Sequence, residues 1–162
     1  MPKHTPQRQL VHLLQTAYSG EMAAALAYRG HWRSLPPSAE RERIRQIERE
    51  EWRHRRGVGV MLRRLEAEPQ QAREILMYLL GRVAGLLCHA AGWFWPMYIA
   101  GKLERSNVRE YDDAAACAGR LSLTKYEKIL RRMAEVEKEH ELYFTEVIAD
   151  HWFLLVLRGL SD

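Results

Sequence analysis

The chain has 162 residues, of which 47% are hydrophobic and 28% charged, and its 25 lysines and arginines against 21 acidic residues give a net charge of +4. This composition excludes a disordered or collagen-like chain, and the length predicts a single domain over residues 1–162. With only Cys88 and Cys117, no Cys-x-x-Cys metal site or disulfide framework can form, so a reducing compartment is expected. The first ten residues lack the apolar segment of a signal peptide, which favours a cytoplasmic protein.

The basic excess lies in the first half of the chain. Residues 1–81 carry 14 basic and 9 acidic residues, whereas residues 82–162 carry 11 and 12. Between residues 41 and 64 the arginines alternate with glutamates, as they do on a solvated helix face. Nucleic acid is therefore not the expected partner.

Two long helices are predicted in the first half of the chain. Thr5 is a suitable N-cap, which predicts a helix over residues 6–31. Ser38 is a second N-cap, and the helical pattern then continues over residues 39–67 before Pro69 ends it. Glycine and proline are rare within these intervals, and this favours an all-α fold.

The second half begins with an apolar connector, predicted at residues 70–92. A third helix begins or kinks at Pro96 and ends near Gly119. Ser122 is expected to cap a fourth helix. The apolar residues 152–157 form either its extension or a short separate helix.

The core face of every predicted helix contains metal-ligand residue types among its apolar positions. The first and third helices each carry one glutamate there, and the second and fourth each carry a Glu-x-x-His. The six residues are Glu21, Glu51, His54, Glu104, Glu137 and His140. A glutamate followed 30 or 33 residues later by a Glu-x-x-His thus occurs twice, so each half of the chain is expected to be a helical hairpin.

Two divalent cations would explain these positions. For any one of the six residues, a solvated charge or a hydrogen-bonded core residue is the simpler interpretation. Four carboxylates in core positions are nevertheless costly to bury, and no lysine or arginine lies in the four stripes. One glutamate from each of two helices and a Glu-x-x-His from each of two others is the ligand set of ferritin-like di-iron and di-manganese proteins. We therefore expect a ferritin-like four-helix bundle holding two iron ions, with manganese as the alternative metal.

The residues around Glu21 resemble a known family. Residues 20–30 carry the pattern Gly-Glu-x-x-Ala-x-x-x-Tyr-x-Gly. This pattern, the two Glu-x-x-His motifs and the 53 residues from Glu51 to Glu104 resemble the demethoxyubiquinone hydroxylase family, di-iron monooxygenases of ubiquinone biosynthesis in the ferritin-like superfamily. The resemblance extends from about residue 7 to residue 147, although residues 105–110 differ from the family pattern.

The resemblance implies an oxidoreductase. Two irons at the six residues would activate O2, with electrons from an external donor, and hydroxylate a hydrophobic, quinone-like small molecule. Tyr111, seven residues after Glu104, fits the family's third helix. It is the candidate catalytic residue, either as a hydrogen-bond donor to a ligand or as an electron relay, and a purely structural core aromatic is the alternative.

Two other functions stay open at this stage. A rubrerythrin-like peroxidase or ferroxidase would use the same six residues with peroxide or O2, and without a Cys-x-x-Cys site its electrons would also come from outside the chain. A metal-free helical protein would instead bind a membrane or a protein partner through the connector and the basic second helix.

The connector also contains a charge-free segment. Residues 83–101 include no Lys, Arg, Asp or Glu over 19 residues, a length that could span a membrane. Pro96 and several glycines interrupt the segment, so a transmembrane helix is not predicted. Its aromatic residues are Trp93, Phe94, Trp95 and Tyr98. Such a cluster indicates either peripheral contact with lipid headgroups or an interface between proteins, for example in a homodimer.

Overall fold

The computed structural model describes residues 5–154, and in this part of the chain there are helices and turns but no β-strand. The helices are α1 (Pro6–Ser34), α2 (Ala39–Arg64), α3 (Gln71–Leu87), α4 (Phe94–Arg120) and α5 (Thr124–Val147). The predicted all-α class is therefore confirmed for the described residues.

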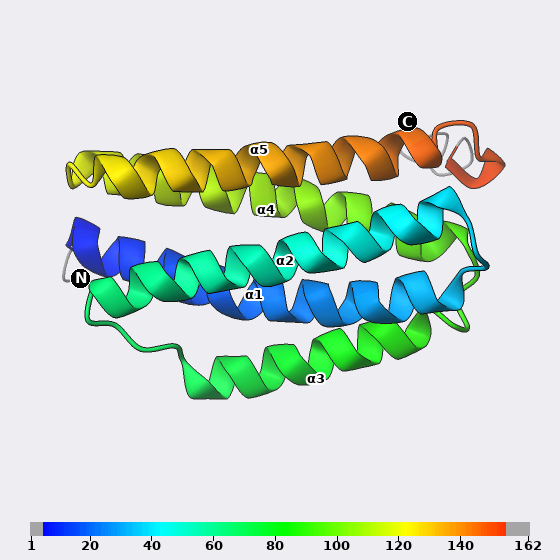
Figure 1. The fold of residues 1–162 in the computed structure, drawn as a ribbon, viewed down its shortest axis with the longest axis horizontal. Helices are drawn as coiled ribbons and strands as arrows, with labels where there is room; N and C mark the ends of the chain where they lie inside the picture. Colours follow the sequence, from blue (N-terminus) through cyan, green and yellow to red (C-terminus); the bar gives the residue numbers. More distant parts are fainter. Residues whose placement is uncertain (1–4, 155–162) are drawn as a thin grey trace.

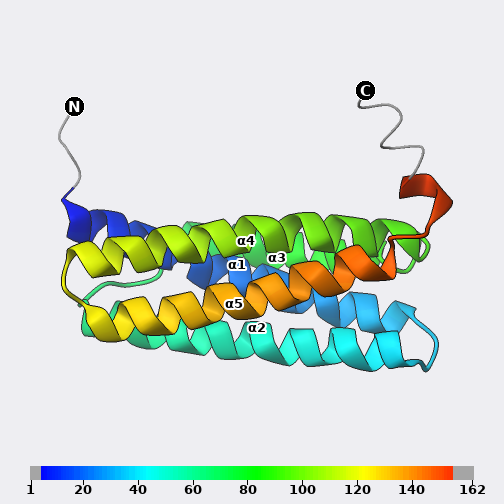
Figure 2. The ribbon, with the colours of Figure 1, turned by 90° about the horizontal axis from the view of Figure 1, so that it is seen from above.

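Two long hairpins face each other. Helices α1, α2, α4 and α5 lie alongside one another, and α3 lies outside them against α1 (Figures 1 and 2). Helix α1 packs along α2, and α4 packs along α5, whereas α2 and α5 contact each other over only a short stretch. The contact between the hairpins is made chiefly by α1 and α4.

The first two helices begin where the sequence predicts. The hydroxyl of Thr5 accepts a hydrogen bond from the amide of Arg8 at 3.4 Å, and that of Ser38 accepts one from the amide of Arg41 at 3.2 Å. These bonds satisfy amides that have no partner within the first helical turn.

Residues 70–92, the predicted apolar connector, do link α2 and α4, and most of them form helix α3, which the sequence interpretation did not assign. Glycines let α3 lie very close to α1. A Cβ atom on Gly81 would lie 2.6 Å from the carbonyl oxygen of Ala23, and Gly30 and Gly85 leave no space for a side chain between them. A largely apolar segment of this kind is difficult to assign from periodicity alone.

The prediction that Ser122 caps the fourth helix is wrong. Its φ is 58°, and its amide donates to the carbonyl of Gly119 at 2.9 Å, so Ser122 belongs to the turn that ends α4. Leu123 precedes α5 instead. A non-helical break separates α5 from a helical turn at residues 152–154, and residues 155–157 of the predicted segment lie outside the described residues.

Two apolar clusters lie on either side of a polar layer. Members of the first cluster are Leu10, Val58, Ala115 and Leu130, and members of the second are Tyr28, Ile47, Met97 and Phe144. Along each of α1, α2, α4 and α5, the glutamates and histidines of the repeated motif fall between these clusters. The fold therefore encloses the polar layer at both ends with apolar packing.

Among residues 5–154, none of the helices is long and apolar enough to cross a lipid bilayer.

Candidate metal centre

The six residues expected to bind metal meet in the polar layer between the hairpins. Helix α1 supplies Glu21, α2 supplies Glu51 and His54, α4 supplies Glu104, and α5 supplies Glu137 and His140. Their exposed fractions range from 0% to 7%. The sequence thus identifies a cluster whose members come from four helices.

These residues form two overlapping groups. In each group, one ligand atom per residue can be chosen so that all of these atoms lie within 4.8 Å of one another. The first group is Glu21, Glu51, His54 and Glu137, and the second is Glu51, Glu104, Glu137 and His140. Because Glu51 and Glu137 belong to both, the arrangement suits two adjacent cations that share two carboxylates.

Both histidines direct a ring nitrogen at these carboxylates. His54 Nδ1 lies 2.6 Å from Glu137 Oε1 and 3.8 Å from Glu21 Oε1. His140 Nδ1 lies 3.3 Å from Glu51 Oε1 and 3.7 Å from Glu137 Oε2. Each imidazole therefore has one nitrogen placed to become a metal ligand.

Several atoms at the centre lack the partners that buried polar groups need. Glu21 Oε2, both carboxylate oxygens of Glu51 and His140 Nδ1 form no hydrogen bond within residues 5–154. In the same part of the chain, no lysine or arginine forms an ion pair with the four glutamates of the cluster. Carboxylate and imidazole donors without a counter-charge fit divalent iron or manganese.

The pKa values of the clustered glutamates also reflect the lack of positive charge at the centre. Burial and the neighbouring carboxylates of Glu137 and Glu104 raise the pKa of Glu51 to about 8. Burial and nearby carboxylates also raise the pKa values of Glu21 and Glu104 well above their usual range. For Glu137, burial opposes the shift, but the nearby imidazoles of His140 and His54 lower the pKa. Without cations, the cluster therefore retains protons that metal binding would displace.

Two tyrosines connect the hairpins by crossed hydrogen bonds. The hydroxyl of Tyr28 on α1 donates to Glu104 on α4, and the hydroxyl of Tyr111 on α4 donates to Glu21 on α1. Each tyrosine follows the glutamate of its own helix by seven residues. Tyr111, the candidate catalytic residue, is therefore in contact with a candidate ligand, and Tyr28 is its counterpart in the other hairpin.

The structure adds Glu50, which the sequence interpretation did not select. Glu50 Oε2 lies 2.7 Å from His140 Nε2, on the side of the ring opposite the cluster. Gln46 and Arg43 contact the Glu50 carboxylate at 2.9 and 3.3 Å. Burial opposes the shift, but the hydrogen bonds from His140 and Gln46 lower the pKa of Glu50 to about 2. Glu50 therefore stays ionised and orients the imidazole.

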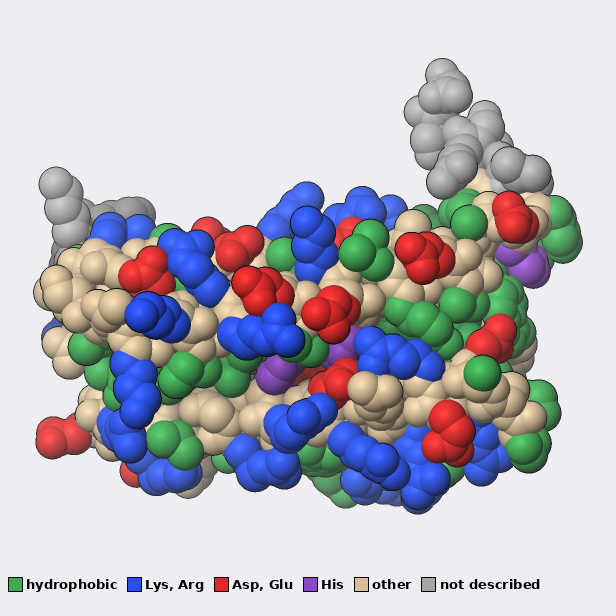
Figure 3. Space-filling model, turned by 45° about the horizontal axis from the view of Figure 1, so that its top comes forward, with side chains coloured by type: hydrophobic (Ala, Val, Ile, Leu, Met, Phe, Trp, Pro, Cys, Tyr) green, Lys and Arg blue, Asp and Glu red, His purple; other side chains and the backbone are tan. Residues whose placement is uncertain are grey.

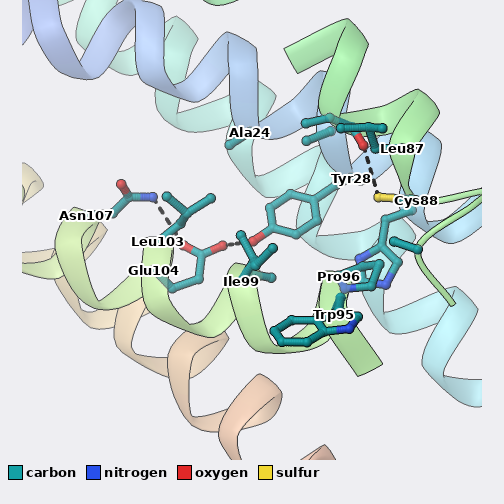
Figure 4. A pocket seen from close by; sticks show the side chains of 15 residues that line it. Ala24, Tyr28, Leu87, Cys88, Trp95, Pro96, Ile99, Leu103, Glu104 and Asn107 are labelled. Carbon is teal, nitrogen blue, oxygen red and sulfur yellow. Dashed lines mark hydrogen bonds between the residues drawn. The ribbon is translucent and has the colours of Figure 1, made fainter. Parts of the chain in front are cut away.

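An apolar pocket reaches the centre from the side of α3. The pocket has a volume of about 180 Å³ and lies between α1, α3 and α4. Its walls include Leu87, Trp95, Ile99 and Leu103, and its inner end is formed by residues at the centre, including Glu104. Figure 4 shows Tyr28 and Asn107 on either side of the Glu104 carboxylate. Asn107, a second residue that the sequence did not indicate, donates to this carboxylate at 3.2 Å.

The opposite surface is strongly charged. Lysines, arginines and acidic residues are numerous on the face formed by α5 and α2, with hydrophobic side chains among them, and histidine is visible between the two helices (Figure 3). His54 lines a surface depression there, whose walls are both basic and apolar: Arg53, Lys128, Arg132, Ile129, Met133 and Val136. Of these two features, the pocket beside α3 is the one that is lined by Glu104.

Comparison of the chain with family models, curated proteins and solved structures finds no match. The chemistry proposed for this site therefore depends on the residues and contacts described above.

Proposed function

We propose that this protein is a ferritin-like four-helix bundle that binds two iron ions and uses O2 to hydroxylate an apolar, quinone-like molecule. The observation that supports this most strongly is the pair of ligand groups that share Glu51 and Glu137. The pocket that ends at Glu104 supports an apolar substrate. Manganese remains the alternative metal, because the same oxygen and imidazole ligands suit it.

The chain's own residues would prepare the centre for this reaction. Bound iron would supply the redox chemistry with O2, and an external donor would supply electrons. The hydrogen bond to Glu50 would keep the proton of His140 on Nε2 and leave Nδ1 free as a ligand. Tyr28 and Tyr111 would hold the carboxylates of Glu104 and Glu21 in place, and the pocket walls would exclude water.

Metal analysis is the first test of the proposal. Protein supplied with Fe(II) under anaerobic conditions is expected to bind about two ions per chain. Exposure to O2 should then oxidise the iron and produce a change in the optical spectrum. A metal content near zero would falsify the metal site and favour the metal-free helical protein. Faster oxidation by hydrogen peroxide than by O2 would favour the rubrerythrin-like peroxidase.

We further propose that the protein binds peripherally to lipid through α3. Most of the outward residues of this helix are apolar, and Ile75, Leu79, Leu86 and Leu87 are 54% to 67% exposed. A helix that faces water normally carries polar residues there. Leu87 is both exposed and part of the pocket wall, so the pocket is continuous with this apolar face. A lipid-soluble substrate could therefore pass from the bilayer into the pocket.

Vesicle flotation tests this surface. The protein is expected to float with vesicles containing phosphatidylglycerol, because the chain has a net positive charge. The double variant Leu79→Glu, Leu86→Glu should lose most of this binding, since it places two charges on the apolar face. The control is Leu142→Glu on α5, where the leucine is 50% exposed. Sedimentation as a dimer that these two charges dissociate, without vesicle binding, would instead identify α3 as a homodimer interface.

A further inference from the structure

A buried histidine lines the apolar pocket without taking part in the metal centre. His31 is on α1, three residues after Tyr28, and is only 3% exposed. Its Nε2 atom is buried and forms no hydrogen bond within residues 5–154. Buried polar atoms in proteins normally have partners, so this nitrogen needs an explanation.

The imidazole ring of His31 packs against an aromatic neighbour, but its Nε2 atom has no polar partner within residues 5–154. The imidazole stacks on Phe144, with ring centroids 6.4 Å apart and an angle of 17° between the planes. Near it in the pocket, Cys88 donates its thiol to the carbonyl of Ala84. Burial lowers the pKa of His31 to about 4, so the ring is neutral at pH 7 and has one N–H donor and one acceptor nitrogen.

The location of His31 suits a molecule that also reaches the centre. Tyr28 and His31 both line the pocket, and three residues of helix correspond to about 4.5 Å along the axis of α1. Tyr28 donates its hydroxyl proton to Glu104 at the inner end of the pocket. A molecule that contacts His31 therefore lies in the same pocket as Tyr28 and Glu104.

We propose that His31 is a positioning residue that hydrogen-bonds to a carbonyl or hydroxyl oxygen of an otherwise apolar molecule in the pocket. This bond fixes which part of the molecule points at Glu104. The inference rests on the proposed function insofar as the pocket is the substrate site, but the binding step itself requires no metal.

Two bicyclic probes with one carbon skeleton test the inference. 1-Tetralone differs from tetralin by a carbonyl oxygen, and calorimetry with the full chain gives the dissociation constant of each. The wild-type protein is expected to bind 1-tetralone about 3- to 10-fold more tightly, the effect of one hydrogen bond. Both probes should slow alkylation of Cys88, which lines the same pocket, while Cys117 is buried and serves as the internal control.

Substitutions at His31 separate recognition from packing. His31→Phe retains a ring against Phe144 but has no polar atom, so it should weaken 1-tetralone binding and leave tetralin binding within about twofold. His31→Gln retains a donor and an acceptor and should restore part of the preference. Circular dichroism melting shows whether each variant is folded. If His31→Phe does not fold, the wild-type preference and His31→Gln decide the outcome.

Three results would overturn the inference: no preference for 1-tetralone in the wild type, an unchanged preference in folded His31→Phe, or no protection of Cys88. These results are independent of metal content. Loss of the metal site with a retained His31-dependent preference would reject the proposed oxidoreductase and keep the binding role. Two bound irons without a preference for 1-tetralone would support the metal site and reject the binding role of His31.

Discussion

Glu51→Gln is expected to remove both metal ions rather than one. Glu51 belongs to both ligand groups, and the amide cannot supply the negative charge that two cations share. Glu104→Gln changes only the second group, so the first group, with Glu21 and His54, should retain an ion. Titration of Fe(II) or Co(II) under anaerobic conditions should give about two ions per chain for wild type, about one for Glu104→Gln and almost none for Glu51→Gln.

Glu48 provides a matched control for these variants. It is a buried glutamate on the same helix, 8% exposed, but its carboxylate accepts hydrogen bonds from Arg29 and Trp32 rather than facing the cluster. Glu48→Gln should therefore keep both ions, even if it lowers the free energy of unfolding. One tightly bound ion in Glu51→Gln would show that this carboxylate is not shared.

The metal-free protein is expected to become less stable as the pH rises from about 5 to about 8. The pKa of Glu51 is about 8 in the folded protein against 4.5 ordinarily, so the folded state retains a proton that the unfolded chain releases. The stability due to this proton is complete below pH 4.5 and is lost as the pH rises through 8. For Glu51 alone the loss is of the order of 5 kcal/mol in the free energy of unfolding.

His140 acts in the same direction. Burial opposes the shift, but the neighbouring carboxylates of Glu137 and Glu50 raise the pKa of His140 to about 12 from 6.5. The stability that protonated His140 contributes to the folded protein is therefore lost progressively as the pH rises above 6.5. The lowered pKa values of Glu50 and Glu137 act below pH 4.5, where their protonation destabilises the folded protein. Stability without metal should therefore be greatest near pH 5.

Urea unfolding in a chelator at about pH 5, 6.5 and 8 measures this dependence. Glu51→Gln should flatten the curve, because glutamine does not titrate, and should be more stable than wild type near pH 8. Divalent metal should stabilise the wild type more strongly as the pH rises, since its ligands must lose protons. An increase in metal-free stability between pH 5 and pH 8 would contradict the assignment of raised carboxylate pKa values.

The candidate metal ligands could be predicted from the sequence, but the residues that form hydrogen bonds to them could not. Glu21 and Glu104 are visible because they interrupt apolar stripes at helical spacing. Glu50 cannot be recognised in this way, because it precedes Glu51 by one residue and points about 100° away around the helix. Its partner, His140 on α5, is brought near only by the tertiary structure. Asn107 is likewise recognisable only once Glu104 and Glu137 are close together.

The same difference applies to the helices. Thr5 and Ser38 act within four residues of their own position, so their capping could be predicted. The packing of α3 depends on the close approach of Gly81 and Gly85 to α1, which no local pattern records. Ser122 has a suitable side chain for capping, but the turn after α4 places it in the left-handed region before α5 begins.

The crossed bonds of Tyr28 and Tyr111 show that the two hairpins contribute matching ligands, yet their surroundings do not match. The position that includes Glu104 adjoins the apolar pocket, and its histidine is held by Glu50. The position that includes His54 lies beside a surface depression with both basic and apolar walls. The repeated hairpin therefore places equivalent candidate ligands at two positions with different surroundings: an apolar pocket beside Glu104 and a more open surface depression beside His54.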